Sequence, residues 1–145
     1  MNTVNAAFQS LLKEKKFAMK ATEKEQEWIY QGRLALSDVH LARFSVSLSK
    51  DPRYAIGQIT YQQIAYMKSS DDPTQWYELV NQLNRDFGVF YYFCLDEDGS
   101  LFARYVSEVS QDLAYFYHIL VQGPALIKEV MPLIEERFGK FVVLQ

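Results

Sequence analysis

Residues 89–106 read VFYYFCLDEDGSLFARYV, in which two apolar runs flank a short polar segment. Aromatic and β-branched residues favour strands, and Gly99 suits a tight turn because glycine tolerates a positive φ. The stretch therefore predicts a β-hairpin with strands at 89–95 and 101–106. The acidic residues between the two strands predict a polar, solvent-exposed turn.

The predicted hairpin is apolar on both of its faces. Side chains alternate across a strand, so Tyr91 and Phe93 share one face while Phe90 and Tyr92 share the other. A sheet that helices cover on one side is normally polar on its second side. Either the second face is covered within the chain, by the C-terminal helix or by a curl of the sheet, or it contacts a partner or a second copy. The expected contact residues are Phe90, Tyr92 and Phe102, with Tyr61 and Tyr66 nearby.

The segment upstream of the hairpin predicts a helix over about 73–87. Asp71 and Asp72 are suited to cap its start, and Pro73 suits the first helical position. Gly88 stands where the end of a helix is expected. One apolar stripe recurs at three- and four-residue spacing. It consists of Trp76, Leu79, Val80, Leu83 and Phe87.

The N-terminal segment predicts an amphipathic helix over about 4–19, capped by Asn2 or Thr3. A polar link is expected at 21–26. Lysines along this region are interrupted by glutamates, which predicts a solvated helix face and its exit rather than a nucleic-acid site. These lysines are Lys13, Lys15, Lys16, Lys20 and Lys24.

The segment between the two helices changes to an extended pattern. Apolar residues alternate over about 28–48, with a break expected at Ser37 and Asp38. A further extended run covers 54–67, in which Gly57 is expected to mark a bulge. This part of the chain therefore predicts three strands.

The C-terminal segment predicts helical structure from about 113 to 138. We expect Gly123 and Pro124 to break it into two pieces, because proline lacks an N–H and clashes with the preceding turn. Pro132 is expected to kink the second piece. The order is then α-β-β-β-α-β-β-α(-α), an α+β fold in which helices pack on an antiparallel sheet of about five strands. With 145 residues, the chain is expected to form a single domain, 1–145.

The sequence offers few residues for catalysis or metal binding. Its two histidines, His40 and His118, and its one cysteine, Cys94, are too few for a disulfide or the usual zinc sites. Both histidines fit structural positions, and Cys94 fits a small core position. In a calcium loop, Cys94 and Tyr105 would fill the first and last ligand positions, where oxygen ligands are needed. We therefore expect no enzymatic activity, no metal and no cofactor.

The net charge and the hydropathy of the chain limit the classes of partner that it is expected to bind. The formal net charge is −3, so the chain gains little from the counterion release that drives nucleic-acid binding. Its longest apolar stretches are shorter than the roughly 18 residues of a membrane-spanning helix. Residues 1–10 lack the pattern of a secretory signal. We expect a cytoplasmic protein that binds neither nucleic acid nor membranes.

The layout resembles that of the YbjN family, which shares its fold with type III secretion chaperones. The resemblance rests on the helix at 73–87, with Asn81 and Asn84, which leads into an aromatic strand, and on the turn LDEDG at 95–99 followed by Leu101. It covers most of the chain by pattern, without a diagnostic motif, and transfers no site residues. It implies a non-enzymatic, often dimeric protein that binds other proteins. The break expected in the last helix departs from the single long helix of that layout.

These observations favour a protein-binding adaptor, chaperone-like or regulatory, that contacts a protein partner or forms a homodimer. A second interpretation is a small-ligand binder or enzyme, which predicts a deep, partly polar cavity between sheet and helices. A third is an antitoxin-like immunity protein, which predicts an acidic exposed face complementary to a basic partner.

Overall fold

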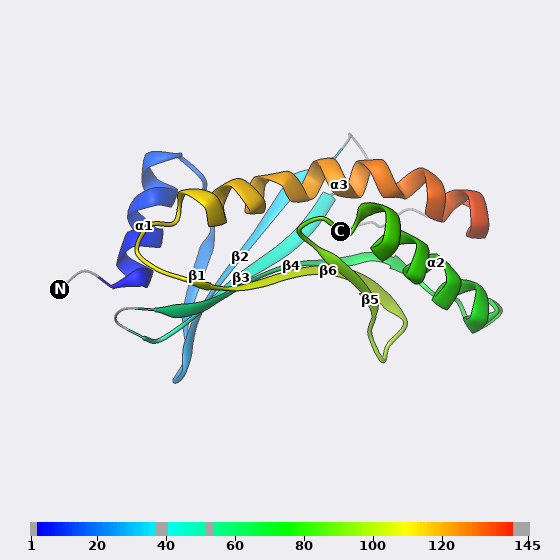
Figure 1. Ribbon diagram of the computed structural model, residues 1–145, viewed down its shortest axis with the longest axis horizontal. Coiled ribbons are helices and arrows are strands. Elements are labelled where there is room, and N and C mark those ends of the chain that lie inside the picture. Colours follow the sequence, from blue (N-terminus) through cyan, green and yellow to red (C-terminus); the bar gives the residue numbers. More distant parts are fainter. Residues whose placement is uncertain (1–2, 37–40, 52–53, 141–145) are drawn as a thin grey trace.

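The computed structural model describes residues 3–36, 41–51 and 54–140. Within them, one six-stranded antiparallel sheet with the order β1-β2-β3-β4-β6-β5 carries three helices along one side (Figure 1). This confirms the predicted α+β class and corrects the strand count from five to six. The helices are α1 (Val4–Glu14), α2 (Pro73–Phe87) and α3 (Ala114–Phe138), and the strands are β1 (Lys20–Glu23), β2 (Glu27–Ala35), β3 (Leu41–Ser49), β4 (Ala55–Tyr66), β5 (Tyr92–Leu95) and β6 (Ser100–Val109).

The additional strand is β1, where the sequence predicts a polar link. β1 pairs with β2 from Lys20↔Gln31 to Glu23↔Trp28 and forms one edge of the sheet. Its side chains are exposed or half-buried, so no alternation of apolar residues marks it as a strand. Short, polar edge strands are common because they discourage pairing with other chains.

β3 shows how the sheet divides into a covered face and an open face. Its even-numbered residues 42–48 are apolar and buried, whereas Arg43 and the serines between them are half-buried. Because all three helices lie on one side of the sheet, the buried residues form the covered face (Figure 1). The predicted break at Ser37 and Asp38, and the histidine His40, lie outside the described residues.

The irregularity of β4 lies further along the strand than predicted. The register of β4 with β6 shifts between Tyr61 and Ala65, and Gln63 there has a φ of 54°. Gly57 instead pairs regularly with β3. A Cβ at Gly57 would lie 2.9 Å from the ring of Phe116. This glycine therefore allows α3 to approach the sheet and does not form a bulge.

α1 begins where predicted and ends earlier. The Thr3 hydroxyl caps the helix by accepting a hydrogen bond of 3.0 Å from a backbone N–H of the first turn, and the other predicted cap, Asn2, lies outside the described residues. The helix ends at Glu14. Phe17 then packs edge-on against Phe44, with 5.8 Å between ring centroids. The apolar residues after the helix thus reach the core from a connecting segment.

α2 covers Pro73–Phe87, as predicted. Asp72 caps it, because its Oδ1 accepts a hydrogen bond of 3.0 Å from a backbone N–H of the first turn. The Asp71 carboxylate accepts hydrogen bonds from the Lys68 backbone N–H at 2.8 Å and the Trp76 indole N–H at 3.0 Å. Both aspartates therefore anchor the start of the helix.

α3 is one continuous helix, so the predicted break at Gly123 and Pro124 is wrong. Pro124 has no N–H to donate to the Leu120 carbonyl one turn earlier. That carbonyl accepts a hydrogen bond of 2.5 Å from the Tyr61 hydroxyl of β4 instead. Gly123 makes the contact possible, since a Cβ there would lie 2.0 Å from the Tyr61 ring. The two residues fit the helix to the sheet without interrupting it.

β5 and β6 form the predicted hairpin with shifted limits. β5 begins at Tyr92, later than predicted, and β6 extends to Val109. Gly99 in the turn has a φ of 86°, as its predicted role requires. The segment before β5 is anchored to α3, because the Tyr91 hydroxyl donates a hydrogen bond of 2.7 Å to the Ile119 carbonyl.

Candidate functional site

The open face of the sheet, opposite the helices, is the candidate binding surface. Its side chains come from the alternate positions that do not enter the core. An aromatic region lies at its β5–β6 end and a cationic region at its β1–β3 end. Between them its centre is polar and carries Ser45, Ser47, Gln58, Thr60 and Gln62.

The aromatic end of the open face consists of Tyr66, Tyr92 and Phe102. Tyr66 and Tyr92 are 41% and 44% exposed, and Phe102 is half-buried. Arg104 contacts two of them: its Nη1 donates a hydrogen bond of 3.3 Å to the Tyr92 hydroxyl, and its guanidinium lies 4.7 Å from the centroid of the Phe102 ring. Tyr66 pairs with Ser100, which shares its face of β6 with Phe102. Three of the five predicted contacts thus share one surface.

Tyr61 and Phe90, the other two predicted contacts, lie elsewhere. Tyr61 is on the covered face and 1% exposed, so its prediction as a contact is wrong. Burial also raises the pKa of its hydroxyl far above the ordinary value. Phe90 precedes β5 and packs edge-on against Tyr115 of α3, with 6.3 Å between ring centroids. It is therefore on the helix side of the sheet. Strand alternation could have separated Tyr61 from Tyr66, because the two are an odd number of positions apart.

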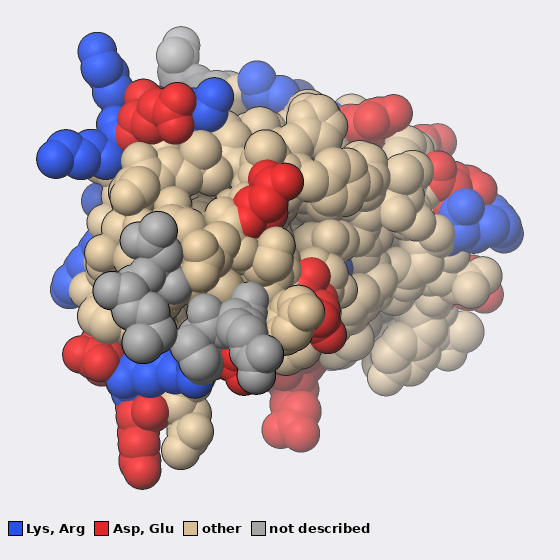
Figure 2. All heavy atoms as spheres, turned by 60° about the vertical axis from the view of Figure 1, so that its left-hand side comes forward, with Lys and Arg blue, Asp and Glu red and all other residues tan. Residues whose placement is uncertain are grey.

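The lysines in and just after α1 face solvent, and one of them, Lys20 on β1, also lines the cationic hollow of the open face described below. Figure 2 brings the α1 end of the molecule forward and shows most of the Lys and Arg side chains in view toward its left and upper edges, beside a largely uncharged area in which a few Asp or Glu side chains lie. Lys15 lies over the ring of Tyr117, with 5.7 Å from its Nζ to the ring centroid. As predicted, these lysines are exposed: Lys13, Lys15, Lys16, Lys20 and Lys24.

A cationic hollow of ≈ 340 Å³ lies at the other end of the open face. The register of β2 with β3 places Arg33 directly opposite Arg43, and that of β1 with β2 places Lys20 opposite Gln31. Like charges directly opposite each other destabilise a sheet. The isolated fold therefore carries an electrostatic cost at this place. The hollow is lined by Lys20, Gln31, Gly32, Arg33, Arg43, Phe44 and Gln62.

The three cations of the hollow form no ion pair within the described ranges. The Nε of Arg43 is shielded from water, and no acceptor among the described residues takes its hydrogen. A buried donor without an acceptor costs about 1–3 kcal/mol. The strands also place Glu27 and Glu108 on the open face, at its far end. Glu27 lies about 20 Å along β2 from Arg33, too far for an ion pair.

The sequence alone does not indicate the cationic hollow. Lys20 follows the lysines of the first helix in the sequence, and no local signal marks β1 as a strand. The alternation within β3 does indicate that Arg43 belongs to its polar face. It does not indicate which residue of β2 lies opposite, because the register depends on the connection between the strands.

The residues with catalytic or metal-binding potential stay apart. Cys94 is half-buried opposite Phe102 on the open face, not in the core as predicted. His118 is exposed on α3, with its ring 6.2 Å from that of Tyr115. No group of three or more His, Cys, Asp or Glu residues in the described part of the chain is placed to hold a metal ion. None of the described helices has the length and apolarity needed to cross a membrane.

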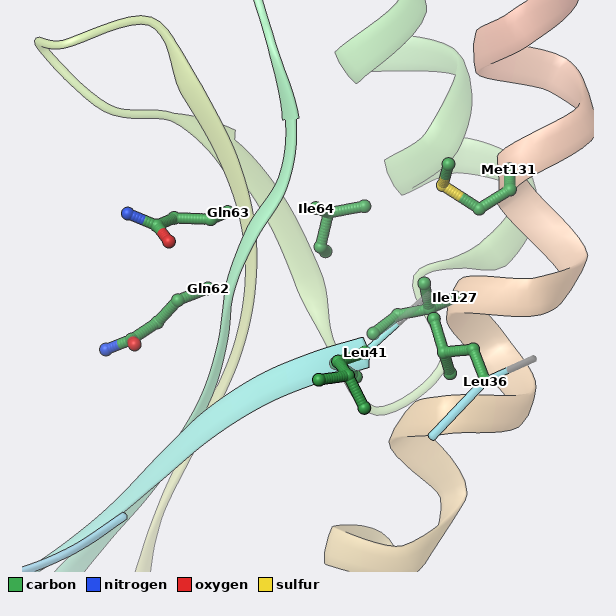
Figure 3. A pocket seen from close by; sticks show the side chains of 8 residues that line it. Leu36, Leu41, Gln62, Gln63, Ile64, Ile127 and Met131 are labelled. Atoms are coloured by element: carbon green, nitrogen blue, oxygen red, sulfur yellow. The ribbon is translucent and has the colours of Figure 1, made fainter. Parts of the chain in front are cut away.

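A small cavity lies between the end of the sheet and α3 (Figure 3). Its volume is ≈ 20 Å³, about the space that a single water needs. Leu41, Ile64 and Ile127 gather around it, while Gln62 and Gln63 extend from the opposite side of β4. Sites for small molecules usually measure about 300–1,000 Å³. This cavity gives no support to a ligand site between sheet and helices.

No model of a known protein family matches the chain, and no curated protein matches it either. The open face, with its aromatic end and its cationic hollow, is therefore the feature of the molecule that points to a function.

Proposed function

We propose that this chain is a non-enzymatic protein-binding module that contacts another protein through the open face of its sheet. The observation that carries the proposal is the exposure of Tyr66 and Tyr92 on a face that no described helix covers. Tyrosine is enriched at protein interfaces because it buries a large area at a low cost in side-chain entropy. A chaperone-like or regulatory role, a cytoplasmic location and the resemblance to the YbjN family belong to this proposal.

The aromatic end has the composition of a binding hot spot. Such spots are enriched in tyrosine and arginine, and here Arg104 holds Tyr92 and Phe102 through a hydrogen bond and a ring contact. The edge of β5 is less suited to receive a partner strand. The Asn84 side chain of α2 already bonds to both the N–H and the C=O of Phe93 on that edge. The face of the sheet is therefore the better contact surface.

A different protein suits the open face better than a second copy. A two-fold contact joins the same surface of both chains, so each hollow would need acidic residues from the same face. Among the described residues, the strands supply only two acidic side chains on this face, Glu27 and Glu108, against the three cations of each hollow. A different partner has no such restriction. The homodimer expected from the sequence stays a prediction, which light scattering tests.

The alternative functions have less support. A ligand binder or enzyme needs converging polar groups, whereas the cavity under α3 is small and mostly apolar. A larger hollow of ≈ 500 Å³ beside α1 has Lys13, Lys16 and Tyr30 in its lining, and no carboxylate, histidine or cysteine among the described residues there. An immunity protein needs an acidic binding face, whereas the hollow on the open face is cationic.

The proposal is tested by capturing a partner with the purified chain and then measuring its affinity in a reconstituted complex. Tyr92→Asp should weaken binding by about 30-fold or more, the loss typical of a hot-spot residue. Tyr77→Asp is the matched control, because Tyr77 is 62% exposed on α2. It should bind like the wild type, and circular dichroism confirms that both variants fold. Equal affinities of wild type and Tyr92→Asp, or capture of nothing except the chain itself, would refute the proposal.

A further inference from the structure

We infer that the cationic hollow binds carboxylate groups, and that the partner contacts the open face with an acidic segment. The inference rests on the proposed function and goes beyond it by stating the chemistry of the partner. It is carried by three features of the hollow: its cations converge, no described acidic residue pairs with them, and its described lining has no exposed aromatic ring.

The strand pairing makes the cations converge. Arg33 lies opposite Arg43, Arg43 lies opposite Gln62, and Lys20 lies opposite Gln31. Directly opposite side chains on one face have their Cβ atoms about 4.5–5.5 Å apart. Three cations and two amide groups therefore surround one hollow of ≈ 340 Å³.

Among the described residues, the cations of the hollow have no acidic partner, although the chain is rich in acidic residues. Asp and Glu number 18 and Lys and Arg 15, yet no described acidic residue pairs with Lys20, Arg33 or Arg43. The Nε–H of Arg43 is shielded from water and has no acceptor in the described structure. Two opposed arginines and one unused buried donor are what a site for an incoming acceptor requires. A bound carboxylate would relieve both the repulsion and the missing hydrogen bond.

Carboxylates fit the hollow better than a nucleic acid does. Sheets that bind single-stranded nucleic acids interleave cations with exposed aromatic rings on which bases stack. The aromatic residue in the hollow's lining is Phe44, whose ring is 1% exposed and packs on the covered face. Tyr92 is about 19 Å away from β2, four strand spacings across the sheet. Arginine forks bind carboxylates and phosphates alike in a bidentate geometry, so the carboxylate is favoured because the described lining of the hollow offers no exposed ring for a base to stack on.

The stability of the free protein provides the first test. Arg33→Gln removes one of two opposed like charges, so it should raise the melting temperature by about 1–3 °C at low salt. The gain should disappear at high salt, because salt screens exposed charges. Arg85→Gln is the matched control, because Arg85 pairs with Asp86 at 3.0 Å. It should leave the melting temperature unchanged or lower it. A fall in melting temperature with Arg33→Gln that equals the control's would overturn the inference.

Direct binding provides the second test. The full-length chain is titrated into a fluorescein-labelled oligoglutamate peptide, with oligoglutamine and single-stranded oligothymidylate as comparison probes, and anisotropy is measured. Oligoglutamate should bind most tightly, and Arg33→Gln or Arg43→Gln should weaken it about tenfold or more. Lys15→Gln, in the lysine group near α1, should change little. No binding of oligoglutamate, tighter binding of oligothymidylate, or an equal loss with Lys15→Gln would each overturn the inference.

The same probe separates this inference from the proposed function. Tyr92→Asp should leave oligoglutamate binding unchanged, because residue 92 lies outside the hollow. If the captured partner tolerates Tyr92→Asp while oligoglutamate still requires Arg33, the proposed function fails and the carboxylate site stands. If the partner requires Tyr92 and oligoglutamate does not bind, the carboxylate site fails alone.

Discussion

Tyr61 makes two contacts with α3 in the core, one through its ring and one through its hydroxyl. Its ring fills the space above Gly123, and its hydroxyl donates a hydrogen bond of 2.5 Å to the Leu120 carbonyl. That carbonyl has no intrahelical donor because Pro124 occupies the position one turn later. One tyrosine side chain thus explains why a proline is tolerated inside the helix.

The first prediction concerns the coupling between Tyr61 and Pro124. Tyr61→Phe leaves the buried Leu120 carbonyl without a donor, so it should lower the free energy of unfolding by about 1–3 kcal/mol. Adding Pro124→Ala restores a backbone N–H that can bond to this carbonyl, and it should recover part of the loss. Urea denaturation of the wild type, both single variants and the double variant measures the coupling energy.

The control for this double-mutant cycle is the second proline of α3. Pro132 is exposed and lies two turns further along the helix, away from Tyr61. Pro132→Ala should therefore be additive with Tyr61→Phe. Coupling energies of equal size for Pro132 and Pro124 would show that the hydroxyl does not replace the missing N–H.

The second prediction concerns Asp71 and pH. Hydrogen bonds from the Lys68 backbone N–H, and then from the Trp76 indole, lower the pKa of Asp71 below its ordinary value of 3.8. A lowered folded-state pKa means that this stabilisation is complete above the unfolded-state pKa and is lost as pH falls through the folded-state value. Asp71→Asn should therefore destabilise the chain at neutral pH and much less in strong acid. Chemical denaturation at both pH values measures the difference.

Asp72→Asn is the matched control for Asp71. Asp72 caps α2, and asparagine is about as good a capping residue as aspartate. The control should change stability little at neutral pH. A loss of stability with Asp71→Asn that is the same in acid as at neutral pH would contradict the role given to its carboxylate.

At the scale of elements, α2 closes the edge of the sheet. Phe93 of β5 donates its N–H to the Asn84 side chain at 2.6 Å, and its C=O accepts the Asn84 amide N–H at 3.0 Å. The helix side chain thus takes the place of a neighbouring strand at this residue. Closing an edge in this way discourages pairing with strands of other chains.

The third prediction follows from that closure. Asn84→Ala removes both hydrogen bonds, so it should lower the free energy of unfolding by about 1–3 kcal/mol. It should also promote self-association at high concentration, because the edge of β5 becomes available. Asn81→Ala is the control, since Asn81 is exposed on the same helix. Denaturation and light scattering test both effects, and equal behaviour of the two variants would contradict the role of Asn84.

Elements that contain their own signals were predictable from the sequence. α2 begins after Asp72 and ends before Gly88, as its capping residues indicate, and Tyr66, Tyr92 and Phe102 lie on the open face. Other features depend on distant segments. β1 is a strand because β2 pairs with it, and α3 is continuous because β4 supplies a donor. The cationic hollow depends on the register between β2 and β3, which no local pattern specifies.

At the scale of the whole molecule, the two faces of the sheet have different roles. The covered face and the helices form the core, in which the aromatic rings of Phe8, Phe44 and Tyr61 are buried. The open face adds little to that core and carries exposed aromatic residues at one end and, at the other, cations that pair with no described acidic residue. Its two ends suit a partner that presents both apolar and acidic groups.

The fourth prediction concerns the salt dependence of the complex. If an acidic segment occupies the cationic hollow, the affinity for the partner should fall as ionic strength rises from about 0.05 M to about 0.5 M. Arg33→Gln should weaken this dependence, because one of the charges in the hollow is removed. Calorimetric titrations at several salt concentrations measure both slopes. An affinity independent of salt, or equal slopes for wild type and Arg33→Gln, would contradict the electrostatic contribution.

The most direct test of the account is site-specific photo-crosslinking of the open face in the native host. A benzophenone amino acid replaces Tyr92 on the open face, or Tyr77 on α2 as the control position. The account predicts an adduct with a different protein from position 92 and little or none from position 77. An adduct from position 77 alone, or only a chain-to-chain adduct from position 92, would contradict the claim that the open face binds a partner protein.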